Sequence, residues 1–176
     1  NQQTLGTLDP GSKVLNAFFH SVMSRSGGFH AVDTGAMHDE TLLATTALML
    51  IGGGSAGTAG GIKVTTFLVL GLVVLAEIQG ERDATGFRRR VSNETQRLAL
   101  TVVLLSIAAI GIGTIALLSM SPFGLSRILF EVTSAFATVG LTSGITADLP
   151  PAGQLVLVVL MFAGRVGTVT LAAALA

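Results

Sequence analysis

The chain has 176 residues, of which half are apolar and only 11% are charged, and its ten basic and ten acidic side chains give a formal net charge of zero. Because a soluble domain ordinarily carries about 25% charged residues, this composition argues against a soluble protein, and the balanced charge gives no indication of a nucleic-acid partner. The chain contains no cysteine, which excludes disulfides and thiolate metal sites.

The first half of the chain predicts a short helix, a turn and an interrupted span. The helix is expected at about residues 11–25, which is too short to cross a bilayer. A turn at 26–29 follows, and the run IGGGSAGTAGGIK interrupts the apolar segment at about 41–79. The segment 81–97 holds five arginines, so the positive-inside rule predicts a cytoplasmic linker there and an entry of the short helix from the outer face.

The second half repeats this order behind a complete span. The run 98–120 has no charged side chain, and a helix of that length reaches about 34 Å, enough for a hydrocarbon core of about 30 Å. A second short helix is expected at about 125–137, a second turn at 138–141 and a final apolar helix at about 152–176. The uncharged run is the clearest indication that the chain spans a membrane.

One constant shift along the chain aligns the two halves and predicts an internal repeat. Without any gap, Gly28 falls on Gly140 and Gly52 falls on Gly164. Apolar residues match one another easily by chance, whereas two glycine pairs in one ungapped frame are a more specific match.

The repeated turns predict the lining of a pore. Non-helical backbone inside a bilayer is tolerated only where protein buries it or where it lines a watery cavity. Carbonyl groups in such a turn replace the water shell of a cation, and glycine permits the backbone angles that aim them inward. The predicted fold is therefore an all-α membrane protein of repeated helix–pore helix–filter–helix units, pseudo-symmetric around an ion pore.

These motifs together resemble the Trk/Ktr/HKT superfamily of potassium transporters, and the bacterial Trk and Ktr membrane subunits fit best. SVMSRSGGFHAVDTG and GGGSAGTAGGIK are similar to the filter and the interrupted inner helix of the third pore unit of that family, and FEVTSAFATVGLTSG and MFAGRVGTVT to those of the fourth. The resemblance implies a third unit without its outer helix at 1–80, the cytoplasmic linker at 81–97 and a fourth unit at 98–176. Two earlier units would complete the pore.

The resemblance also assigns candidate site residues. The ion filter would consist of Ser26, Gly27, Gly28, Phe29, Thr138, Val139, Gly140 and Leu141, with a potassium ion at the carbonyls of Gly28 and Gly140. The third filter of the family often reads T-R-T-A-G-F where this chain reads SRSGGF, so the preference for potassium over sodium stays open.

The glycine-rich interruption predicts a gate below the filter. Its residues, together with one arginine, form the candidate gate: Gly53, Gly54, Ser55, Ala56, Gly57, Thr58 and Arg165. Arg165 is the repeat partner of Gly53 and lies at membrane depth, where an arginine normally faces an interior cavity, which we favour, or else extends its side chain toward the inner surface. Glu131 is a further carboxylate at membrane depth, which either steadies the pore helix or adds negative potential near the filter.

Two other classes of function compete with a pore. Gly52, Gly54 and Gly57 have the G-x-G-x-x-G spacing of a dinucleotide-binding enzyme, and Glu77 lies at the distance expected for a ribose ligand. However, no alternation of strands and helices follows, so we expect no enzyme. The second alternative is a structural glycine-rich membrane subunit whose turns bind no ion.

The resemblance implies potassium as the transported ion and no covalent cofactor. Its implied partners are the rest of the same chain, a second copy in a homodimer, a cytosolic nucleotide-binding regulatory subunit and the lipid bilayer, and it gives no nucleic-acid partner. The implied location is the inner (plasma) membrane, which the chain would cross several times.

Overall fold

Helices are the main secondary structure of the described chain. The computed structural model describes residues 4–6, 8–25, 27–54, 60–80, 85–86 and 89–167. In these ranges the elements, in chain order, are α1 (Pro10–Met23), η1 (Thr34–Ala36), α2 (Asp39–Leu50), α3 (Val64–Gln79), β1 (Thr85–Gly86), β2 (Arg89–Arg90), α4 (Asn93–Met120), α5 (Leu125–Phe136), η2 (Thr146–Asp148) and α6 (Pro151–Val166). The two short strands pair antiparallel, Thr85 with Arg90 and Gly86 with Arg89.

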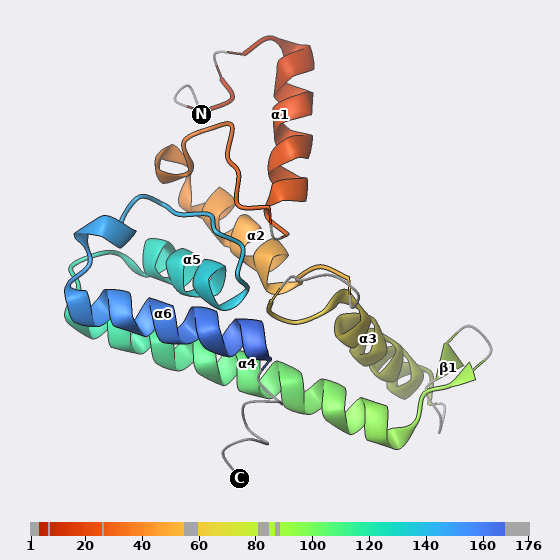
Figure 1. The fold of residues 1–176 in the computed structure, drawn as a ribbon. Helices are drawn as coiled ribbons and strands as arrows, with labels where there is room; N and C mark the ends of the chain where they lie inside the picture. The colour runs from red at the N-terminus through yellow and green to blue at the C-terminus, as the bar shows by residue number, and fades with distance from the viewer. Residues whose placement is uncertain are drawn as a thin grey trace.

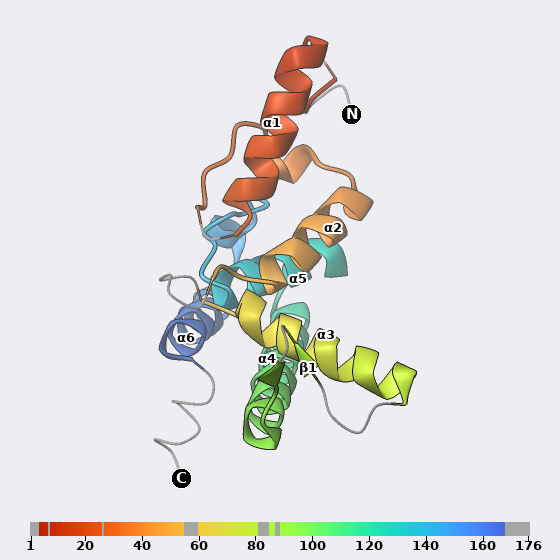
Figure 2. The same ribbon diagram turned by 90° about the vertical axis from the view of Figure 1, so that its right-hand side faces the viewer.

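The short helix α5 lies at the centre of the arrangement. It packs against α2, α4 and α6, while α4 and α6 also pack against each other (Figure 1). Helix α3 contacts α4 and runs toward the β1–β2 pair, and α1 extends away from α4 and α6 in both views (Figures 1 and 2). The fold therefore surrounds one short helix and the turn that follows it.

The repeat predicted from the sequence is visible in the backbone. The shift that places Gly28 on Gly140 also places η1 on η2 and the first residue of α2 on the first residue of α6. Gly28 and Gly140 both have left-handed backbone angles, with φ of 68° and 91°. The fold class is as predicted, an all-α chain in which the order short helix, turn and further helix occurs twice.

Helix α4 is, within the described ranges, the one helix that is both long and apolar enough to cross a membrane, and α3 and α6 are shorter apolar helices. It begins at Asn93 rather than at the predicted residue 98, because the Ser92 hydroxyl accepts a hydrogen bond from the backbone N–H of Thr95 and caps it. Apolarity marks the part of a helix inside the bilayer, not its polar first turn.

The first short helix has a similar polar cap. The carboxylate of Asp9 accepts hydrogen bonds from the backbone N–H groups of Gly11 and Ser12, both at 3.1 Å. Hydrogen bonding to Ser12, through its side chain and its backbone, lowers the pKa of Asp9 below its ordinary value. Helix α1 therefore begins at Pro10 and ends at Met23, close to the predicted range of 11–25.

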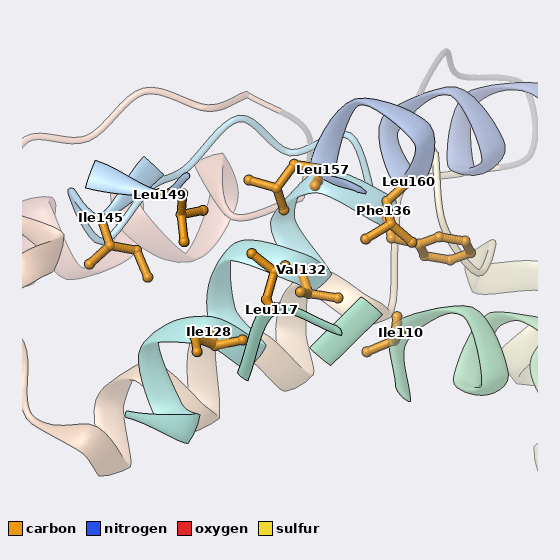
Figure 3. Close-up of a cluster of buried hydrophobic side chains, with 10 residues drawn as sticks. Ile110, Leu117, Ile128, Val132, Phe136, Ile145, Leu149, Leu157 and Leu160 are labelled. Atoms are coloured by element: carbon orange, nitrogen blue, oxygen red, sulfur yellow. The ribbon is translucent and has the colours of Figure 1, made fainter. Parts of the chain in front are cut away.

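The packed core joins α5 to its neighbours and supports the second turn. Figure 3 shows side chains of α4, α5 and α6 meeting around Val132, Phe136 and Leu160. A second cluster joins α2 to α5 and to the following turn, and consists of Leu42, Met49, Phe130, Ala137, Val139 and Leu141. Because lipid is as apolar as these side chains, close packing rather than water exclusion holds such helices together.

Two glycines on the packed faces of α6 and α4 have different surroundings, so replacing them by alanine should destabilise the fold to different extents. A Cβ on Gly164 would run into the carbonyl oxygen of Phe136, which is backbone and moves little, whereas a Cβ on Gly113 would lie 2.7 Å from a terminal methyl of Leu160. We expect Gly164→Ala to destabilise by roughly 3 kcal/mol and Gly113→Ala by less than about 1 kcal/mol. Thermal unfolding of both variants of the intact protein in detergent checks this order, and equal shifts would contradict it.

Candidate functional site

The second glycine turn (138–141) is folded back onto the end of α5. The backbone N–H groups of Thr138 and Val139 donate to the carbonyls of Ala135 and Ser134, at 3.1 and 3.0 Å. Thr138 then adopts φ of 53°, a left-handed conformation that is uncommon outside glycine. The Ser134 hydroxyl donates to the carbonyl of Leu141 at 2.6 Å, so Leu141 anchors the turn to α5.

The first glycine turn (26–29) follows α1 in a related way. The N–H groups of Gly27 and Gly28 both donate to the carbonyl of Met23, at 3.0 and 3.3 Å. The side chain of Phe29 is exposed. Ser26, which the sequence also assigns to the filter, lies outside the described residues.

The two turns meet backbone to backbone. A Cβ on Gly28 would lie 2.6 Å from the carbonyl oxygen of Val139 and 3.3 Å from the Cα of Gly140, and a Cβ on Gly140 would lie 3.5 Å from the Cα of Gly28. Only residues without a side chain can approach in this way. The structure thus brings together Gly28 and Gly140, the two glycines that the sequence predicts to bind an ion.

The glycine loop (51–63) is closed at its neck. Ile51 and Ile62 form a parallel bridge, and the N–H of Gly52 donates to the carbonyl of Ile62 at 2.8 Å. Gly53, from the predicted gate, accepts a hydrogen bond from the N–H of Val64 at 3.4 Å. Space around Gly54 is open to 4 Å among the described residues. The other predicted loop residues, Ser55, Ala56, Gly57 and Thr58, lie outside the described residues.

The end of this loop is docked at the base of the second glycine turn. The N–H of Gly60 donates to the Thr138 hydroxyl at 2.9 Å, and a Cβ on Gly60 would lie 3.0 Å from the carbonyl oxygen of Gly164. Gly61, with φ of 72°, would bring a Cβ to 3.2 Å from Ala137. Gly60 and Gly61 were not predicted as site residues, although both lie in the glycine run, because the repeat pairs Arg165 with Gly53 and gives no sign of a contact with Thr138.

One cavity of about 640 Å³ connects the second turn with the predicted gate arginine. Its lining includes Thr138 and Gly140 from the turn, Glu131 from α5 and Arg165 from α6. Gly164 lies against both the carbonyl of Phe136 and the loop residue Gly60, and Arg165 is the next residue of α6. A cation in the second turn and the guanidinium of Arg165 would therefore share this cavity.

Comparison with known proteins decides the family. All residues of the chain, 1–176, match the TrkH family of cation transport proteins. The chain belongs to this family. Two similar proteins are named as potassium uptake proteins. Ktr system potassium uptake protein B of Bacillus subtilis is 41% identical to this chain over 172 residues, and the protein of the same name from Vibrio alginolyticus is 38% identical over 176 residues.

The matches cover nearly all of this chain but only part of each relative. The two Ktr proteins are matched over 97% and 100% of this chain and over 38% and 39% of their own lengths. Potassium/sodium uptake protein NtpJ of Enterococcus hirae is 40% identical over 162 residues, which are 90% of this chain and 36% of that protein. The chain thus spans less than two fifths of the length of these relatives.

A solved structure has the same fold. The crystal structure of the potassium transporter TrkH from Vibrio parahaemolyticus superposes with a TM-score of 0.78 at 19% sequence identity, over 97% of this chain and 39% of that chain. The TrkH-family relatives are named as transporters and not as enzymes. In this chain the G-x-G-x-x-G spacing begins after helix α2 and not after a strand, so it lacks the context that a dinucleotide-binding fingerprint requires.

Proposed function

We propose that the chain forms two pore units, the third and the fourth, of a membrane protein that takes up potassium. The observation that carries the proposal is the contact between Gly28 and Gly140, two left-handed glycines from separate units whose backbones meet at the ends of two short helices. Their carbonyls would coordinate the ion in place of water, as rings of backbone carbonyls do in potassium-selective pores. The relatives' names, which mention potassium and in one protein also sodium, agree with a monovalent cation.

The glycine loop would act as the gate. Its end is hydrogen-bonded to Thr138 and packed against Ala137 after α5, which supports a place for the loop at the base of the proposed fourth filter. Arg165 lines the same cavity as Thr138 and Gly140, and its positive charge would raise the energy of a cation there. A loop that moved away from Thr138, together with the arginine, would lower this barrier.

The intact protein would have further parts and partners. The match covers less than two fifths of each relative's length, so a protein as long as these relatives could hold two earlier pore units in the same chain. Helix α4 and the shorter apolar helices α3 and α6 support a membrane location, and the resemblance to the family adds several crossings and the inner membrane. A homodimer and a cytosolic nucleotide-binding regulatory subunit complete the proposal, by resemblance to the family.

Ion uptake by the intact protein in liposomes tests this function. We expect potassium uptake down an imposed gradient, and a thermal stabilisation of the detergent-solubilised protein by potassium of about 2.7 kcal/mol at a concentration 100 times the dissociation constant. Choline chloride at equal ionic strength is the control. A glycine-rich structural subunit would give neither uptake nor a potassium-dependent shift, and that result would overturn the proposal.

A further inference from the structure

Glu131 is a carboxylate inside the packed part of the molecule. It lies on α5 and only 4% of its surface is exposed. Its Oε1 accepts hydrogen bonds from the Thr142 hydroxyl at 2.7 Å, from the Ser143 N–H at 2.7 Å and from the Ser143 hydroxyl at 2.9 Å, and its Oε2 accepts one from the Thr146 hydroxyl at 2.8 Å. The four donors all belong to the segment 142–146.

This donor set fits a carboxylate in particular. A carboxylate has about four acceptor positions on its two oxygens and no proton to donate, and hydrogen bonds to a charged acceptor are shorter and stronger than neutral ones. A glutamine at the same place would turn an N–H group toward one or more of these donors. The four donors therefore match the two acceptor oxygens of a glutamate better than the amide of a glutamine.

The segment held by Glu131 directly continues the fourth filter. Thr142 follows Leu141, whose carbonyl accepts from Ser134, and Ser134 lies one turn after Glu131 on α5. Helix α5 thus fixes both the last residue of the filter and the segment beyond it. A filter strand held at its far end keeps its carbonyls at set distances from the ion.

The same segment also touches the outer part of the third unit. A Cβ on Gly35 would lie 2.7 Å from the carbonyl oxygen of Ser143. Arg127, one turn before Glu131 on α5, donates to the carbonyl of Gly35 at 3.5 Å. Through Ser143, Glu131 therefore supports the place where the outer segments of the two units meet.

The third unit keeps the threonine of this arrangement but lacks the carboxylate. The repeat aligns Thr34 with Thr146 and Phe19 with Glu131. Thr34 is 2% exposed, and its hydroxyl oxygen is buried without a hydrogen-bond partner among the residues that the structure describes. The support is thus specific to the fourth unit, and the two filters are held differently.

We propose that Glu131 is a positioning residue that holds the fourth filter in register and thereby sets the preference for potassium over sodium. The proposal rests on the proposed function of the two turns as an ion filter. Glu131 acts through its hydrogen bonds to the segment 142–146, not through the potential of its charge at the pore mouth. A filter released from this support would fit the smaller sodium ion more readily.

Uptake of potassium and sodium by the intact protein in liposomes tests the proposal. The variants are Glu131→Gln, which alters the acceptor, and Thr146→Val, which removes one donor and keeps the charge. We expect the ratio of potassium to sodium uptake to fall about tenfold in the first variant and about threefold in the second. This ratio does not depend on the amount of folded protein, so a general loss of stability would not change it.

Two matched controls accompany these variants. Thr34→Val makes the same change at the equivalent position of the third unit, where the hydroxyl has no partner in the described part of the chain, and should leave the ratio unchanged. Glu40→Gln removes an exposed carboxylate from the first turn of α2 and should also leave it unchanged. If Glu131→Gln does not fold, Thr146→Val against Thr34→Val still decides the question.

The outcomes separate this inference from the proposed function. Equal losses of potassium and sodium uptake in Glu131→Gln, with Thr146→Val at the level of the unaltered protein, would assign Glu131 an electrostatic role and overturn the inference. Unchanged ratios in both variants would overturn it as well. An unaltered protein that takes up no potassium would instead overturn the proposed function itself.

Discussion

Gly28→Ala is expected to lower potassium uptake by the intact protein about 100-fold. Gly28 has φ of 68°, and an added Cβ would lie 2.6 Å from the carbonyl oxygen of Val139. The left-handed conformation alone costs an alanine roughly 1–2 kcal/mol, and a carbonyl in the opposing turn cannot give way without changing the ion site. A total of about 2.7 kcal/mol corresponds to the 100-fold loss. Uptake rates at equal amounts of membrane-inserted protein measure it.

Two other glycines separate the causes of this effect. Gly80 has nearly the same φ, 70°, with open space to 4 Å among the described residues, so Gly80→Ala carries the conformational cost without the collision. Gly140 has φ of 91° and a nearest atom at 3.5 Å, so Gly140→Ala should reduce uptake less than Gly28→Ala. Potassium uptake at the unaltered rate in Gly28→Ala would show that the contact of the two turns does not form the ion path.

The second large effect is a gain of flux. Arg165→Ala should raise potassium uptake about tenfold, which corresponds to about 1.4 kcal/mol, because the positive charge of Arg165 would raise the energy of a cation in the cavity that it lines together with Thr138 and Gly140. Deletion of residues 53–57 should raise uptake more, because it shortens the loop whose end is hydrogen-bonded to Thr138 in the proposed filter. Initial rates in liposomes, at matched protein content, measure both changes.

A conservative change in the loop serves as the reference for these two variants. Gly54 has open space around it among the described residues, so Gly54→Ala keeps the length of the loop and should change uptake much less than the deletion. Arg165→Lys keeps the charge and should stay close to the unaltered protein. If neither Arg165→Ala nor the deletion conducts faster than the parent, the loop and the arginine do not restrict the pore.

Much of the fold could be predicted because it follows from patterns along the chain. Apolar length separates the span at 98–120 from the short helices, and the shift that aligns Gly28 with Gly140 also aligns η1 with η2. A cap, by contrast, is a local hydrogen bond, so apolarity alone misplaces the start of α4, which lies at Asn93.

The contacts between distant segments could not be predicted from one sequence. The bond from Gly60 to Thr138 joins residues 78 positions apart, and no spacing rule relates them. The sequence leaves the role of Glu131 open for the same reason, since its four donors lie 11 to 15 residues further along the chain and no spacing rule relates them to it. Such pairings depend on how the turns fold back, which only the structure describes.

The closed neck of the glycine loop bears on how this family can diverge. The bridge between Ile51 and Ile62 and the bond from Gly52 to Ile62 fix the points where the chain leaves α2 and returns toward α3. Lengthening a loop between fixed ends costs little, about 0.6 kcal/mol for each doubling. Insertions there would lengthen the segment between α2 and α3 while the two helices keep their register, so the length of this loop can vary without disturbing either glycine turn.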